Sequence, residues 1–239
     1  MILPFGEWTP DVEGLSVKGL TVAENCVPGP DGYGPLNSLS DVTNALTAKC
    51  VGAAWFADKT GTVKVYAGDA TKLYSLSGAT WSNVSKSGNY TGGTNWEFAL
   101  WGDRCIAVDP SINPQYIDMS TGTLFADLPG SPPKAARIAV VGDFIVLGDL
   151  ESKPNWVRWS GFNASELWTA SMATQSDSQE LFGRGGKVQK IIGGNVGVIF
   201  QEHSIRLMTY EGPPRILSLI HISEPTRRTP ISYAVFCLK

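Results

Sequence analysis

Acidic residues that could carry out acid–base chemistry recur through the middle of the chain. They are Asp103, Asp109, Asp118, Asp143 and Asp149. Glycosidases use a pair of carboxyl groups on either side of the scissile bond, so two of these aspartates could form such a pair. Most of them, however, stand in turn sequences beside glycine or proline, where aspartate typically caps the backbone. The pattern favours a structural role over catalysis.

The other catalytic motifs are incomplete. His203 lies in a Gln-Glu-His-Ser turn, and no Gly-x-Ser-x-Gly elbow is present to carry a serine nucleophile. Residues 183–187 combine three glycines with a lysine, but they lack the spacing and the following helix of a phosphate-binding loop. We interpret His203 as a surface turn residue and 183–187 as a connecting loop. The sequence therefore predicts no enzymatic activity, no cofactor and no metal site.

The last residues of the chain resemble translated reagent DNA. Leu217–Arg227 corresponds to one reading frame of a transposase-based sequencing adapter, and Ile231–Leu238 corresponds to the downstream primer. Arg228–Pro230 occupy the position of a sample index between them. Such segments are excluded from fold reasoning. We expect 217–239 to be a non-native tail, and the natural chain to lose its own C-terminal part near Ile216.

Charge and cysteine usage limit the possible partners. Setting aside the three basic residues and the one acidic residue of the tail changes the formal net charge from −3 to about −5. An acidic chain without a Lys/Arg block offers no electrostatic attraction for duplex DNA or a membrane surface. Three widely spaced cysteines, Cys26, Cys50 and Cys105, are expected to be buried free thiols. The start of the chain lacks the pattern of a signal peptide.

The composition and the spacing of turns predict β structure. Glycine (26 residues), proline (15) and tryptophan (8) are abundant, and only 17% of the residues are charged. Four hairpins recur, with starts roughly 40, 40 and 50 residues apart, as in propeller blades. The expected hairpins are 62–67 with 72–76, 104–108 with 115–119, 144–147 with 155–159, and 197–200 with 204–208. Glycine turns at Gly102, Gly142 and Gly193–Gly194 precede three of them.

A single four-stranded sheet cannot bury both of its faces, so the repeated sheets should stack around an axis. We therefore expect an all-β chain whose residues 51–216 form a partial, truncated β-propeller of antiparallel blades. A sandwich or jelly roll of similar hairpins remains the alternative. The tryptophans would wedge between blades or form a stacking platform for sugars or bases. Trp156 and Trp159 should face opposite sides of their sheet.

Residues 1–50 are rich in proline and glycine and should form an extended arm. Ile2, Leu3, Phe5 and Trp8 are too apolar for a solvated tail. They are the candidate inter-subunit anchors, docking either on a neighbouring subunit or on the chain's own propeller.

Several runs of residues resemble one family of phage proteins. The runs are Ile2–Trp8, Ala23–Pro28 with Gly32–Pro35, Ala67–Gly68 with Lys72–Tyr74, Arg137–Leu147, Trp159–Gly161, and Ile191–Gly194 leading to Ile199–Phe200. In this order they resemble the packaged-DNA stabilisation, or tail accessory, proteins of short-tailed bacteriophages. The resemblance implies a structural virion protein of the head-to-tail connector. Such a protein forms a ring-shaped homo-oligomer beneath the portal, with portal, adaptor and tail proteins as partners, and seals the DNA channel. The family offers no catalytic motif, and its members are far longer than 216 residues.

Two further expectations concern the DNA channel and the last blade. Packaged DNA would pass the ring without sequence-specific binding, helped by an acidic lining that repels phosphate. The last blade of a truncated propeller would expose an apolar flank and a strand edge.

A receptor- or carbohydrate-binding propeller of a phage tail is the alternative function. A cellular propeller scaffold is a third reading, weakened because Gly-His and Trp-Asp repeat motifs are missing.

Overall fold

The computed structural model describes residues 8, 11, 22–29, 32–38 and 40–222. The chain divides into two compact units, Met1–Val42 and Thr43–Lys239. In the first unit, β1 (Cys26–Gly29) pairs with β2 (Gly32–Pro35) in an antiparallel ladder. The predicted arm thus contains a hairpin, and the division lies at residue 42 instead of residue 50.

The segment after residue 42 belongs to the second unit because it bonds to the first blade. The indole Nε1 of Trp81 donates to Thr43 Oγ1 at 3.1 Å, and the backbone N–H of Trp81 donates to Asn44 Oδ1 at 2.7 Å. Thr47 Oγ1 donates to the carboxylate of Asp69 at 3.0 Å. These contacts place residues 43–47 with the first blade.

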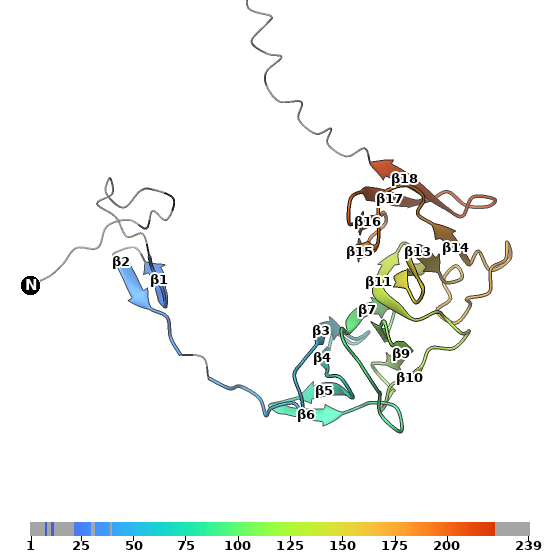
Figure 1. Cartoon of the computed structure of the whole chain (residues 1–239). Helices are drawn as coiled ribbons and strands as arrows, with labels where there is room; N and C mark the ends of the chain where they lie inside the picture. Colours follow the sequence, from blue (N-terminus) through green and yellow to red (C-terminus); the bar gives the residue numbers. More distant parts are fainter. Residues whose placement is uncertain (1–7, 9–10, 12–21, 30–31, 39, 223–239) are drawn as a thin grey trace, which may run out of the picture. The chain divides into compact units, whose positions relative to one another are not determined.

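The second unit consists of four antiparallel sheets, each with four strands in chain order (Figure 1). The first blade holds β3 (Gly52–Ala57), β4 (Val63–Gly68), β5 (Leu73–Ser77) and β6 (Thr80–Asn83). The second holds β7 (Glu97–Trp101), β8 (Arg104–Asp109), β9 (Ile112–Asp118) and β10 (Ala126–Asp127). The third holds β11 (Ala135–Val141), β12 (Phe144–Leu150), β13 (Lys153–Trp159) and β14 (Asp177–Glu180). The fourth holds β15 (Val188–Ile192), β16 (Gly197–Gln201), β17 (Ile205–Tyr210) and β18 (Leu217–Ile222).

The blades contact one another in chain order. The first strands of successive blades are neighbours, β3 with β7, β7 with β11, and β11 with β15. No comparable contact joins the first and fourth blades among residues 43–222. The fold is therefore all-β, a partial β-propeller of antiparallel blades as predicted, and not a two-layer sandwich.

Three separate apolar cores lie between the four blades. Leu73, Trp96 and Phe125 belong to the core between the first and second blades. Ile106, Leu147 and Trp168 belong to the next core, and Val157, Trp159, Ile199 and Met208 to the last. Neighbouring residues of one strand serve different cores, as Cys105 and Ile106 do, because side chains alternate across a sheet. Burying each large side chain contributes about 1.5–3 kcal/mol.

Trp96 is held at the first interface by two glycines. A Cβ at Gly52 would lie 2.1 Å from the carbonyl oxygen of Trp96, and a Cβ at Gly68 would lie 2.2 Å from its indole.

Trp96, Trp159 and Trp168 are each at most 3% exposed, which confirms for these three the prediction that tryptophans wedge between blades. Trp55 is 67% exposed and contradicts it. Trp156 and Trp159 pack into different cores, as predicted.

The four predicted hairpins are confirmed as the second and third strands of the four blades. Gly102 and Gly142 have φ values of +58° and +54°, as their turns require. One detail was wrong. The turn after Asp109 is shorter than expected, because β9 begins at Ile112.

The fourth strand of the last blade lies within the segment that resembles reagent sequence. In β18, Leu217 pairs with Tyr210 and Ile222 with Ile205, and Leu217 and Ser218 are buried. Apolar residues in this strand suit it to pairing through the backbone with an open sheet edge. The pairing does not test the origin of the segment, which stays a prediction.

Candidate interaction surfaces

Two of the five aspartates proposed for acid–base chemistry accept hydrogen bonds from backbone N–H groups of turns and loops. Asp109 is fully buried, and its carboxylate accepts from the backbone N–H of Thr94 at 2.7 Å, Asn95 at 2.8 Å and Ser111 at 2.8 Å. Asp103 accepts from the N–H of Lys59 at 3.1 Å. The interpretation as capping residues is confirmed for both.

Asp69 occupies the same place in the first blade that Asp109 occupies in the second, directly before the turn between the second and third strands. Its carboxylate accepts from the N–H of Thr71 and of Lys72, both at 2.7 Å, and from the Tyr74 hydroxyl at 2.8 Å. Burial opposes ionisation, but these hydrogen bonds outweigh it and lower the pKa of Asp69. Sequence reasoning missed Asp69, although its spacing of 40 residues from Asp109 was visible.

Asp103 and Asp118 line one cavity of about 380 Å³ together with Glu166. Arg104 lies between the carboxylates, with Nε 2.7 Å from Asp118 and Nη1 3.6 Å from Glu166. Hydrogen bonds from Ser120 and Lys59 lower the pKa of Asp103. A glycosidase acid needs a raised pKa, so Asp103 is suited to ion pairing and capping, not to proton donation.

The remaining predicted polar sites are dispersed. Asp143 lies exposed in the turn between β11 and β12, and Asp149 pairs with Lys187 Nζ at 2.8 Å. His203 is exposed in the turn between β16 and β17, as predicted. Residues 183–187 connect β14 to β15. Within the described residues, no group of three His, Cys, Asp or Glu side chains is placed to hold a metal ion.

The cysteines only partly match the prediction. Cys105 is fully buried, and its burial raises the pKa of the thiol. Cys26 is half-buried and Cys50 is exposed, so the prediction of three buried thiols was wrong for these two. All three are free.

No helix among the described residues is long and apolar enough to cross a membrane.

Glu97 joins three blades, and nothing in the sequence pattern pointed to it. Its carboxylate, at the start of β7, accepts from the backbone N–H of Ile138 at 3.2 Å. It also lies 3.5 Å from Arg137 Nη1 on β11 and 3.0 Å from Lys190 Nζ on β15. The first strands of the second, third and fourth blades therefore carry one acidic and two basic side chains, and the acidic Glu97 pairs with both basic ones.

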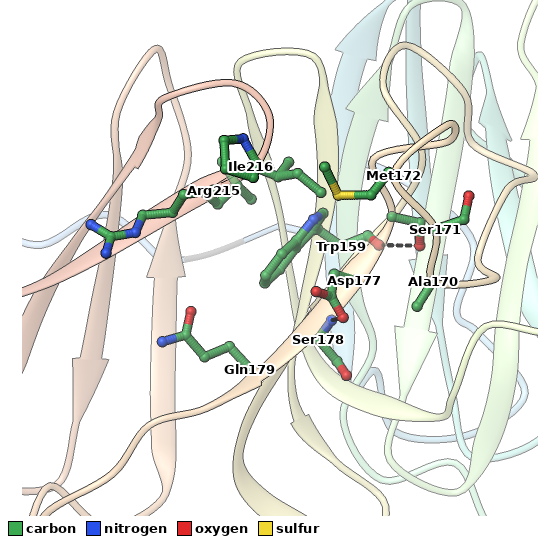
Figure 2. A pocket seen from close by; sticks show the side chains of 12 residues that line it. Trp159, Ala170, Ser171, Met172, Asp177, Ser178, Gln179, Arg215 and Ile216 are labelled. Carbon is green, nitrogen blue, oxygen red and sulfur yellow. Dashed lines mark hydrogen bonds between the residues drawn. The ribbon is translucent and has the colours of Figure 1, made fainter.

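A cavity of about 650 Å³ lies between the loop 170–176 and the β17–β18 hairpin (Figure 2). Figure 2 shows Met172, Asp177, Gln179 and Arg215 around the indole of Trp159. Trp159 is only 3% exposed, and its Nε1 donates to the carbonyl oxygen of Gln175 at 2.9 Å. The indole thus belongs to the interblade core and offers no open stacking face.

The outer face of the fourth blade is apolar and uncovered among residues 43–222. Ile192, Val198 and Leu207 form one row across β15, β16 and β17, and Phe200 and Ile205 lie in a second row, in which Lys190 pairs with Phe200. Ile192 is 52% exposed, whereas its neighbour Ile191 is buried in the core against the third blade. The predicted apolar flank is confirmed.

The outer face of the first blade carries a similar row. Trp55 pairs with Val65, Val65 with Leu76, and Leu76 with Trp81. Trp55 and Val63 are more than half exposed, but part of this face is covered, because Trp81 donates to Thr43 Oγ1 and the Tyr74 hydroxyl, on the same face, hydrogen-bonds with Thr47. Both ends of the series of blades therefore present apolar residues that no neighbouring blade covers.

The predicted inter-subunit anchors Ile2, Leu3 and Phe5 lie outside the described residues. Trp8 is described and is 52% exposed, and its backbone N–H donates to the Tyr33 hydroxyl at 2.9 Å. Docking of the arm on a neighbour or on its own propeller stays a prediction.

No protein-family model and no curated protein matches the chain. Among solved structures, the chain is similar to the computationally designed Ika4 protein, with 11% identity, 78% of this chain and 99% of that chain covered, and a TM-score of 0.44. It is also similar to BamB from Moraxella catarrhalis (12% identity, TM-score 0.42, 70% of this chain covered) and to the N-terminal domain of Nup159 (9%, 0.41, 72%). The match spans about half the length of these two chains, 46% and 47%. The assignment of the blades rests on the sheet order and the interblade cores.

Proposed function

We propose that this chain is a structural virion protein of the head-to-tail connector of a short-tailed bacteriophage. In this role it would assemble as a ring-shaped homo-oligomer with portal, adaptor and tail proteins, close the channel and hold packaged DNA in place. The role is structural and not enzymatic, and the protein acts in the virion after assembly in the host cytoplasm.

The proposal rests on the apolar faces of the two terminal blades that no neighbouring blade covers. Exposed apolar patches of this kind mark surfaces that other proteins cover. The faces lie at opposite ends of one series of blades, so contacts through them are heterologous, and such contacts close into a ring when the rotation per subunit divides a full turn. The order of residue runs that resembles the connector family supplies the second support.

One observation favours the alternative, a receptor- or carbohydrate-binding propeller of a phage tail. The cavity of Figure 2 gathers Asp177, Gln179 and Arg215 at one opening, as a polar ligand would require. The buried state of the Trp159 indole weakens this alternative, because sugar binding usually employs an exposed aromatic face.

Long-read sequencing of the source DNA through and beyond codon 216 tests the proposal. We expect portal and terminase genes beside this one, and a reading frame that departs from the present sequence at codon 217. Neighbouring genes for polysaccharide uptake or degradation would favour the carbohydrate-binding alternative. Neighbours unrelated to phage assembly would overturn the connector proposal.

A further inference from the structure

A cavity of about 330 Å³ in the fourth blade is lined by basic and neutral groups alone. It lies between the loop 182–185 and the turn that joins β16 to β17. Arg184 and Arg206 line it, with His203 and Ser204 beside them, and no aspartate or glutamate takes part. The lining thus carries at least two positive charges and no negative charge.

Arg206 is held in one orientation by uncharged acceptors. Its Nε donates to Gln201 Oε1 at 2.9 Å, and its Nη2 donates to the carbonyl oxygen of Phe182. Neither Arg184 nor Arg206 forms a salt bridge within the described part of the chain. Burial lowers the pKa of Arg206, as expected for a partly desolvated cation without a carboxylate beside it.

The residue that caps the turn after the second strand differs among the blades, and in the fourth blade it is not an acid. The second strand ends at or directly before Asp69 in the first blade and at Asp109 in the second, and each carboxylate caps the following turn. In the fourth blade Gln201 occupies this place, and its side chain bonds to Ser204 and to the carbonyl oxygen of Gly186. The turn is still capped, but by a neutral amide, whose Oε1 also accepts from Arg206 Nε.

We propose that this cavity binds a phosphate group. The planar guanidinium of Arg206 presents its remaining N–H groups in a fork that matches phosphate oxygens, and Arg184 approaches from the loop. His203 adds a donor at the rim. The volume accommodates a free phosphate ion or the phosphate end of a phosphorylated sugar, the two sources of the same chemistry. The proposal does not depend on His221, which also lines the cavity but lies in the segment that resembles reagent sequence.

Isothermal titration calorimetry on the full chain tests this site with inorganic phosphate, glucose 6-phosphate and unphosphorylated glucose. We expect saturable binding of phosphate that weakens as sodium chloride is added, because salt screens exposed charges. Arg184→Gln and Arg206→Gln should each weaken binding by about ten- to hundredfold, the range for hydrogen bonds to a charged group. Lys59→Gln removes the same charge from the first blade and should leave binding unchanged.

Arg184→Gln is the deciding variant, because the Arg184 side chain makes no hydrogen bond in the described residues whereas Arg206 also holds the loop. Tighter binding of glucose 6-phosphate than of inorganic phosphate would support a phosphorylated sugar as the ligand, and equal binding would support the free ion. The proposal is overturned if neither anion gives saturable heat, if glucose binds as well as its phosphate, or if Arg184→Gln binds phosphate as tightly as the unchanged chain.

Discussion

At the scale of single residues, buried aspartates fix the turns of the first two blades. Asp109 accepts hydrogen bonds from the backbone N–H groups of Thr94 and Asn95, in the loop before β7, and of Ser111 in its own turn. We predict that Asp109→Asn lowers the free energy of unfolding by about 1–3 kcal/mol, because an amide has one acceptor atom where the carboxylate has two. Urea denaturation measures the effect. Asp143→Asn, on an exposed turn, is the control and should change stability by less than about 0.5 kcal/mol.

The lowered pKa of Asp69 predicts a loss of stability in acid. Since the folded pKa lies below the unfolded value of about 3.9, the stabilisation is fully present above that value and disappears as the pH falls through the folded pKa. Thermal melts between about pH 5 and pH 2 should show a steep decline for the unchanged chain and a shallower one for Asp69→Asn. Equal slopes for the two proteins would contradict this assignment.

At the scale of elements, the sequence identified the second and third strands of each blade. These strands have glycine or aspartate turns and β-branched residues, so local chemistry determines them. The first and fourth strands were harder to predict, because Gly52–Ala57 is rich in alanine and Asp177–Glu180 is polar throughout. Contacts between distant segments determine them, as Glu97 shows by bonding to two other blades. The cavity proposed to bind phosphate was missed for the same reason, since Arg184 and Arg206 lie 22 positions apart in the sequence.

The close packing of β11 and β15, the first strands of the third and fourth blades, leaves no room for a side chain at Gly193. A Cβ at Gly193 would lie 2.1 Å from the carbonyl oxygen of Val140, where the third and fourth blades meet. Backbone cannot move aside as a flexible side chain does, so Gly193→Ala should destabilise the chain by about 1–3 kcal/mol. Differential scanning calorimetry should show a lower midpoint for this variant. Gly34→Ala, where a Cβ meets nothing within 4 Å, should leave the midpoint unchanged.

At the scale of the whole molecule, the four blades described in residues 43–222 bury three interfaces, and one face of the first blade and one of the fourth have no neighbouring blade. Each internal interface joins one face of a blade to the opposite face of the next, so the proposed ring would bring the free face of the first blade of one copy against the free face of the fourth blade of another. Their apolar rows would be covered by additional blades, by partner subunits or by nonspecific association. In all three cases the isolated chain should associate through Trp55, Ile192 and Leu207.

Sedimentation velocity over a hundredfold range of protein concentration tests this claim most directly. The unchanged chain should form larger species as concentration rises, and a variant with Ile192→Lys and Leu207→Glu should remain monomeric with an unchanged circular dichroism spectrum. Asp143→Lys, a charge change on an exposed turn of the third blade, should associate like the unchanged chain. An unchanged chain that stays monomeric throughout the range and melts cooperatively would contradict the account.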